Sequence, residues 1–147
     1  MKDLIRFVRP QDAARILEIY APYITDTVIS FEYEVPTPVE FAARVESSSR
    51  YPYLVYEREG KVLGYAYASA YNERVAYDYT VDLSVYVDAA FCGQNIGECL
   101  YAALLDILEK LGYYNAYACI TAINQNSLNF HKRMGFEDAG THKLAGF

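Results

Sequence analysis

The clearest alternation of apolar and polar residues lies in residues 79–87. Side chains that alternate in this way point to opposite faces of an extended strand, so we expect one face to pack in a core and the other to carry polar groups. The apolar face holds Val81, Leu83, Val85 and Val87, and the opposite face holds Asp82, Ser84, Tyr86 and Asp88.

A second periodic segment follows this strand after a short loop. Apolar residues recur with helical spacing at Leu100, Leu104, Ile107, Leu108 and Leu111, which predicts an amphipathic helix over residues 96–111 that ends at Gly112. The loop before it contains Gly93, Asn95 and Gly97. Such a junction presents backbone N–H groups and the positive end of a helix dipole to an anion. The alternative is an ordinary tight turn before a capped helix.

The same signals predict the remaining elements. Strands are expected over residues 4–8, 53–56, 62–70, 115–120 and 136–144. Helices are expected over residues 12–22, ended by Pro22, over residues 38–47, begun by a capping box at Thr37, and after Ser127 as far as Met134. Residues 57–60 read as a tight turn and residues 25–36 as a long irregular connection. This order predicts one domain, residues 1–147, built on a mixed α/β sheet.

Composition narrows the possible partners. A net charge of −6 argues against nucleic acid, because phosphate binding needs a basic face. No apolar run approaches the ~18 residues needed to span a membrane. The charged N-terminus lacks the apolar segment of a signal peptide, so a cytoplasmic protein is expected. The three cysteines have no paired spacing and suggest neither a disulfide framework nor a metal site.

Tyrosine is in excess, at 16 residues. Rings of this kind commonly fill cores and interfaces. The other interpretation is an aromatic-lined substrate pocket that includes Tyr71, Tyr77 and Tyr79. The two interpretations are compatible.

Several separate segments occur in an informative order: residues 9–20, 30–32, 62–66, 74–81 and 124–136, with the strand S-V-Y-V and the loop C-G-Q-N-I-G between the last two. Together they resemble the GNAT superfamily of N-acetyltransferases, and within it the phosphinothricin (methionine sulfone) acetyltransferase branch. The resemblance implies a mixed, mostly antiparallel central sheet, flanked by helices and splayed between its fourth and fifth strands. It also implies an enzyme that transfers an acetyl group from acetyl-CoA, without a metal, to a small primary amine.

The resemblance implies where acetyl-CoA binds. The superfamily loop usually reads Q/R-x-x-G-x-G/A, and here those positions are residues 92–97, with Cys92 and Gln94 in place of common polar or basic residues. Asn95 replaces a glycine, and asparagine tolerates the left-handed backbone that the loop needs. We therefore expect binding that is retained but weaker by about one or two orders of magnitude, because each charge-assisted phosphate contact is worth roughly 1–3 kcal/mol. The expected cofactor-binding residues are Val85, Tyr86, Val87, Gly93, Gln94, Asn95, Ile96, Gly97, Asn124 and Ser127.

Two residues are candidates for proton transfer. Asp82 occupies the position at which the branch carries a glutamate thought to be the general base, and its alternative is an exposed edge carboxylate. His131 occupies a position where many members of the superfamily have a tyrosine that serves the coenzyme A sulfur, and its alternative is a structural histidine. Asn124 has an alternative as well, as the N-cap of the helix that follows it. Cys92 is interpreted as a small filler in preference to a reactive thiol.

Four residues match the acceptor side of the branch: Phe31, Glu32, Arg74 and Tyr77. A buried arginine flanked by aromatic rings would suit the carboxylate of an amino acid or analogue, such as phosphinothricin, methionine sulfone or methionine sulfoximine. The alternative for Arg74 is a surface cation. The resemblance also implies a homodimer and a further C-terminal strand segment that this chain is expected to lack. The competing hypothesis is a catalytically weak or silent acetyl-CoA-binding module.

Overall fold

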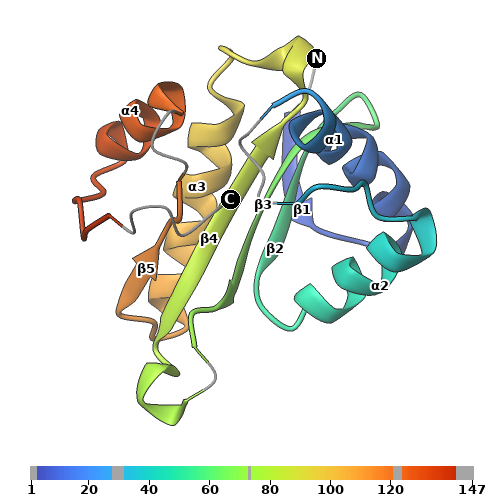
Figure 1. The fold of residues 1–147 in the computed structure, drawn as a ribbon. Helices are drawn as coiled ribbons and strands as arrows, with labels where there is room; N and C mark the ends of the chain where they lie inside the picture. Colours follow the sequence, from blue (N-terminus) through green and yellow to red (C-terminus); the bar gives the residue numbers. More distant parts are fainter. Residues whose placement is uncertain (1–2, 28–31, 73, 121–123, 142–147) are drawn as a thin grey trace.

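A computed structural model describes residues 3–27, 32–72, 74–120 and 124–141 of the chain. Its centre is a five-stranded sheet in the order β1-β2-β3-β4-β5 (Figure 1). The strands are β1 (Asp3–Phe7), β2 (Tyr53–Arg58), β3 (Lys61–Ala70), β4 (Thr80–Val87) and β5 (Asn115–Tyr117). The helices are α1 (Ala13–Thr25), α2 (Pro38–Ser48), α3 (Ile96–Lys110) and α4 (Gln125–Arg133), with short 3-10 turns η1 (Pro10–Asp12), η2 (Val75–Tyr77) and η3 (Ala89–Phe91).

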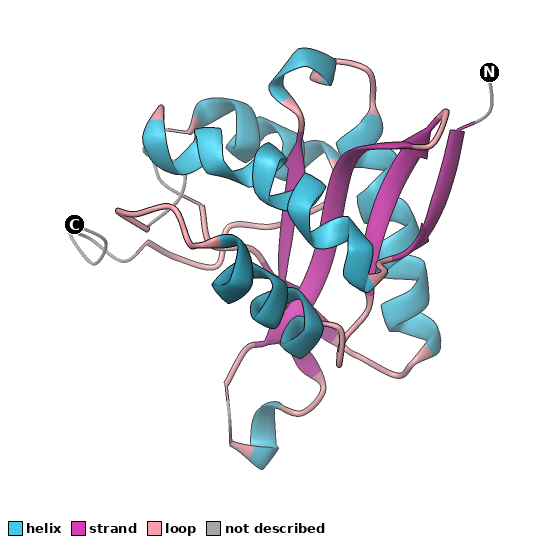
Figure 2. Cartoon of the chain, turned by 90° about the vertical axis from the view of Figure 1, so that its right-hand side faces the viewer, coloured by secondary structure: helices cyan, strands magenta, loops and turns pink. Residues whose placement is uncertain are grey.

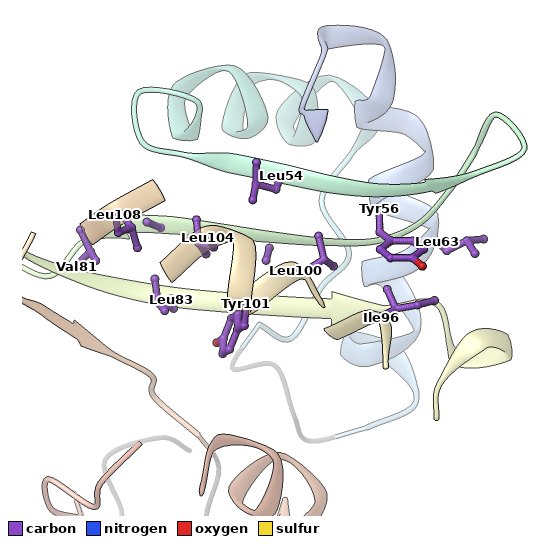
Figure 3. Packing of buried hydrophobic residues seen from close by; sticks show 12 residues of the cluster. Leu54, Tyr56, Leu63, Val81, Leu83, Ile96, Leu100, Tyr101, Leu104 and Leu108 are labelled. Carbon is purple, nitrogen blue, oxygen red and sulfur yellow. The ribbon is translucent and has the colours of Figure 1, made fainter. Parts of the chain in front are cut away.

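Helices cover both faces of the sheet (Figure 2). On one face, α3 packs on β2, β3 and β4 through buried Leu100, Leu104 and Leu108. Figure 3 shows this core, which also contains Tyr56 and Tyr101. On the other face, α1 and α2 enclose an aromatic layer that joins Tyr20, Tyr53 and Tyr65. The alternation predicted for residues 79–87 is confirmed, because Val81 and Leu83 face α3 and Tyr86 faces α1.

Neighbouring strands run antiparallel from β1 to β4, and β5 joins β4 in parallel. The mixed, mostly antiparallel sheet expected from the sequence is therefore confirmed. Glu59 and Gly60, both at positive φ, make the tight turn between β2 and β3. The turn is shorter than predicted, since the ladder continues to the pair Arg58 and Lys61.

Four further predictions about elements are wrong in detail. Helix α1 continues through Pro22 to Thr25, and the buried Ile24 helps to hold its last turn in place. Strand β5 ends at Tyr117, earlier than expected, because it diverges from β4. Residues 136–141 form no strand, and the remainder of the predicted strand lies outside the described residues. Leu111 is 60% exposed because α3 has already ended at Lys110.

Candidate functional site

Strands β4 and β5 separate to form the opening expected from the sequence. They pair over three positions, from Thr80 opposite Asn115 to Asp82 opposite Tyr117. β4 continues beyond Asp82 to Val87, still paired with β3 on its other side. The edge of β4 that faces β5 is thus not covered by β5 over Val85, Tyr86 and Val87. Backbone N–H and C=O groups along such an edge can bind an extended chain of amides.

The loop that follows β4 has the backbone shape of an anion site. Gly93 has φ 83° and Asn95 has φ 63°, so the predicted left-handed conformation of Asn95 is confirmed. Within the described residues, the Asn95 side chain makes no capping hydrogen bond to α3. The first N–H groups of this 15-residue helix therefore have no side-chain cap, which favours the anion-site interpretation over a capped turn.

Packing fixes the start of α3 against the sheet. Ile96 is 1% exposed. A methyl group added at Gly97 would lie 3.5 Å from the Phe130 ring and 3.8 Å from Val85 Cγ2, which are ordinary contact distances. Gly64 is tighter, since its added methyl would lie 3.1 Å from both Ile96 Cγ2 and the Tyr86 carbonyl oxygen. The loop is therefore positioned by close contact of α3 with β3.

Two residues outside the predicted set contact this region. The Tyr23 hydroxyl donates to the Val87 carbonyl over 2.6 Å, and burial raises the pKa of Tyr23 to about 12. Arg58 Nη1 donates to Gln94 Oε1 over 2.9 Å. Neither residue carried a motif in the sequence. Arg58 could have been found from the hairpin, because the turn between β2 and β3 must lie at the same end of the sheet as the end of β4.

Asp82 lies on the sheet face that carries α1 and α2, beside Ser69 and Tyr117 in the strand register. It is half-buried, and burial raises the pKa of its carboxyl group above the usual value. In the part of the chain that the structure describes, no arginine, lysine or hydrogen-bond donor holds this carboxylate. A partly desolvated and unpaired carboxylate is a stronger proton acceptor than an exposed one.

Aromatic rings surround the Asp82 end of the opening. The Tyr71 ring stacks on Tyr117 at 4.8 Å and contacts Tyr77 at 5.5 Å. All three are about 40% exposed. Tyr79, the third ring expected in an aromatic pocket, contacts Tyr114 instead. The tyrosine excess therefore fills a buried layer and also forms an exposed aromatic group, and the aromatic-lined substrate pocket stays a prediction.

The structure gives less direct support for the other residues predicted to bind the acceptor amine. Arg74 is exposed on the loop after β3, so the buried arginine that the sequence suggested is not found. The Glu32 carboxylate accepts hydrogen bonds from Tyr20 and Arg44, and the Arg44 guanidinium lowers the pKa of Glu32. Phe31 lies outside the described residues. A shallow pocket close to this ion pair is lined by Tyr20, Phe41, Arg44, Tyr53, Tyr65 and Tyr67.

His131 is 5% exposed, and both of its ring nitrogens are engaged. Nδ1 lies 2.7 Å from the Ser127 carbonyl, to which it donates, and Nε2 lies 3.0 Å from the Tyr101 hydroxyl. Burial lowers the pKa of His131, so the neutral ring is favoured. Phe130 and Phe136 contact the ring edge-to-face. These contacts describe a satisfied buried histidine, and its direct proton transfer to a thiolate stays a prediction.

Asn124 accepts a hydrogen bond from the Ser127 N–H over 3.3 Å and so caps α4. The cap is the alternative that the sequence left open, and it leaves the amide nitrogen of Asn124 able to donate to a ligand. The Cys92 side chain is exposed and does not fill a core. Among the described residues, no group of histidine, cysteine and carboxylate side chains could hold a metal, and no helix is long and apolar enough to cross a bilayer.

Comparisons with known proteins agree with this geometry. Residues 5–147 match the family described as the acetyltransferase (GNAT) domain. The phosphinothricin N-acetyltransferase of Streptomyces viridochromogenes is 36% identical over 97% of this chain and 79% of its own length. The L-methionine sulfoximine/L-methionine sulfone acetyltransferase of Salmonella typhimurium is 32% identical over 90% of this chain and 78% of its own length.

A solved structure gives the same result. The GNAT superfamily phosphinothricin acetyltransferase from Sinorhizobium meliloti, solved in complex with AcCoA, has a TM-score of 0.93 at 34% identity. The match covers 100% of this chain and 81% of that one. The fold of this chain thus belongs to a known architecture, and the resemblance seen in the sequence is confirmed. The chain belongs to the GNAT family of acetyltransferases.

Proposed function

We propose that this protein transfers the acetyl group of acetyl-CoA to the amine of a small amino acid or analogue, of the phosphinothricin or methionine sulfone and sulfoximine type. A single observation carries the proposal: β4 carries a half-buried carboxylate at Asp82, with no partner among the described residues, and leads through η3 into the uncapped loop of residues 92–97. One strand therefore places a base beside the opening and an anion site at its end.

Different residues around the opening would contact different parts of acetyl-CoA. The N–H groups of Gly93 to Gly97 would hold the pyrophosphate, since small residues let an anion approach the backbone. The free edge of β4 over Val85, Tyr86 and Val87 would hydrogen-bond the amides of the pantetheine arm. Asn124 and Ser127 would contact the same arm from the start of α4.

Asp82 would accept a proton from the attacking amine, directly or through one water. The amine must be neutral to attack the thioester, and a carboxylate with a raised pKa favours that transfer. The displaced group is an alkyl thiol, a class that is far more acidic than an amine or alcohol and can leave as a thiolate, so direct protonation by a side chain is not required. His131 would then serve the reaction mainly by holding α4 against Tyr101.

The acceptor would lie on the α1 and α2 side of the sheet, between Asp82 and the rings of Tyr71 and Tyr77. Arg74, exposed on the same loop, would pair with the carboxylate of an amino acid. Glu32 would shape this side through its ion pair with Arg44. Phe31, next to Glu32 in the sequence, stays a proposed acceptor-binding residue.

We also propose that the enzyme works in the cytoplasm as a homodimer. The three cysteines are free thiols, as expected in a reducing compartment. Large exposed apolar side chains gather near the start of β4, including Val75, Tyr79 and Tyr114, and such groups commonly mark protein interfaces. Light scattering of the purified protein tests the dimer.

The competing function is a module that binds acetyl-CoA without turnover. The substitutions at Cys92, Gln94 and Asn95 favour it, as does the aspartate in place of the branch's glutamate. Thiol release in the presence of acetyl-CoA and a panel of amino acids, phosphinothricin and methionine sulfone separates the two functions. Release that depends on an amine supports the enzyme, and binding without release supports the module.

Asp82→Asn is the matching variant for this assay. Loss of a general base lowers kcat by about 10²- to 10⁴-fold, while the affinity for acetyl-CoA should stay within about twofold. Asp106→Asn, an exposed carboxylate on α3, is the control. Full activity in Asp82→Asn would remove Asp82 from the mechanism.

A further inference from the structure

The anion loop, defined as residues 92–97, has no cationic side chain of its own. The β2–β3 hairpin brings two cations to its surroundings. Arg58 Nη1 donates to Gln94 Oε1 over 2.9 Å, although 36 residues separate the two in sequence. The Lys61 ammonium lies 5.9 Å from the centroid of the Phe91 ring, just before the loop.

The sheet register fixes the position of Arg58. Arg58 pairs with Lys61 beside the two-residue turn. Because β3 runs antiparallel to β4, the start of β3 lies beside the end of β4, where Gly64 is opposite Val87. The anion loop leaves β4 at this same end. The guanidinium therefore comes from the ladder of the central sheet, which holds its Cα in place relative to the loop.

Asp3 and Gln94 orient the guanidinium. The Asp3 carboxylate accepts hydrogen bonds from Arg58 Nε and Nη2, each at 3.0 Å. With the bond to Gln94, these contacts use three of the five N–H groups of the side chain. The Tyr56 hydroxyl also interacts with the guanidinium. The N–H groups that these contacts leave can donate to an anion, and 22% of the side chain is exposed. Arg58 is thus both held in place and accessible.

Two carboxylates close to the loop are paired with arginines. Asp88, before the loop, pairs with Arg15, and Glu98, in the first turn of α3, pairs with Arg133 over 3.2 Å. Their negative charges are therefore partly cancelled on either side of the loop. A phosphate at the loop would meet the helix N-terminus and the Arg58 guanidinium together.

We propose that Arg58 binds the pyrophosphate of acetyl-CoA and that Gln94 is a positioning residue that aims the guanidinium at it. This rests on the proposed binding of acetyl-CoA at the loop. Arginine suits phosphate because its planar N–H groups donate in pairs. Arg58 thereby supplies, from the hairpin, a positive charge that residues 92 and 94 lack.

The test compares Arg58→Gln with the wild type in calorimetric titrations with acetyl-CoA and with S-acetyl-pantetheine, which lacks the pyrophosphate. Arg58→Gln should bind acetyl-CoA about tenfold more weakly, as expected for one charge-assisted phosphate contact, and should bind S-acetyl-pantetheine as the wild type does. Lys110→Gln, at the far end of α3, is the control and should match the wild type with both ligands. Equal acetyl-CoA affinity in wild type and Arg58→Gln would overturn the proposal, as would an equal loss with both ligands.

The Asp3→Asn variant distinguishes an effect of the Arg58 charge from an effect of weakening the contact between β1 and β2. Both variants weaken the contact between β1 and β2, but Asp3→Asn removes the carboxylate that offsets the charge of Arg58. Its affinity for acetyl-CoA should equal or exceed that of the wild type. A tenfold loss in Asp3→Asn would show that the strand contact, and not the charge, controls binding.

Failure of this inference can be told from failure of the proposed function. A wild-type protein that binds acetyl-CoA, with Arg58→Gln binding equally well, removes the role of Arg58 and leaves the function intact. A wild-type protein that binds neither acetyl-CoA nor S-acetyl-pantetheine removes both.

Discussion

Replacing Gly64 with alanine should weaken both the fold and acetyl-CoA binding, because Gly64 is the point where β3 meets the start of α3. The added methyl carbon would lie 3.1 Å from Ile96 Cγ2, 3.1 Å from the Tyr86 carbonyl oxygen and 3.4 Å from Leu100 Cδ1. Carbon atoms pack best at about 3.5–4.0 Å. The backbone carbonyl belongs to the sheet, so the helix has to move by a few tenths of an ångström.

Overpacking of this kind costs about 1–3 kcal/mol of unfolding free energy. A protein of 147 residues loses about 3 °C in Tm for each kcal/mol. We therefore expect Gly64→Ala to unfold about 3–10 °C below the wild type. The shift of Ile96 also displaces the N–H groups of the anion loop, so the Kd for acetyl-CoA should rise about fivefold, which corresponds to about 1 kcal/mol.

Thermal unfolding followed by circular dichroism and a calorimetric titration with acetyl-CoA measure the two effects. Gly112→Ala is the matched control, since Gly112 lies just beyond the other end of α3 at φ 92° with no heavy atom within 4 Å of an added methyl carbon. It should lose stability through backbone strain and keep the wild-type Kd. An unchanged Tm in Gly64→Ala, or an equal rise in Kd in both variants, would refute the reasoning.

Three further predictions concern ionisable groups. Burial lowers the pKa of His131 in the folded protein below its unfolded-state value of about 6.5. The contribution of His131 to stability is therefore complete above about pH 6.5 and is lost as the pH falls through the folded-state pKa. In chemical denaturation, the difference in unfolding free energy between wild type and His131→Gln should narrow from pH 7.5 to pH 5. Burial raises the pKa of Asp82, so the ionised carboxylate opposes folding above that pKa. Asp82→Asn should therefore unfold at a higher Tm than the wild type at pH 7, and the difference in Tm should close toward pH 3.5. A lower Tm for Asp82→Asn at pH 7 would contradict this prediction. Asp12 is buried and accepts hydrogen bonds from both Nη atoms of Arg6, at 2.8 and 2.9 Å. Asp12→Asn should therefore lower the free energy of unfolding measured in urea by about 3 kcal/mol. A loss below about 0.5 kcal/mol would show that the ion pair is dispensable.

Features that depend on neighbouring residues in the sequence could be predicted closely. The alternation of residues 80–87 placed Asp82 on the face opposite Val81 and Leu83, and the structure confirms it. The left-handed conformation of Asn95 followed from the φ preference of asparagine, and the start of α2 from its Thr37 cap. Each of these depends on the local backbone, which a short stretch of sequence specifies.

Features that depend on distant contacts could not be predicted in the same way. Pro22 was expected to end α1, yet the helix continues to Thr25 and the Tyr23 hydroxyl reaches Val87, 64 residues away. His131 was a candidate proton donor, and the structure shows both of its nitrogens engaged with Ser127 and Tyr101. A short-range pattern carries no information about which partner a side chain meets across the core.

The sequence by itself determined most of the helices and strands, the face on which Asp82 lies and the small-residue loop that can accept an anion, because periodicity and backbone preference act within a few residues. Only the tertiary structure decided where β5 leaves β4, and that divergence makes the opening in which we propose that acetyl-CoA binds. It also decided that Arg58 meets Gln94. The pairing register of a sheet sets both features, and that register joins segments that the chain keeps far apart.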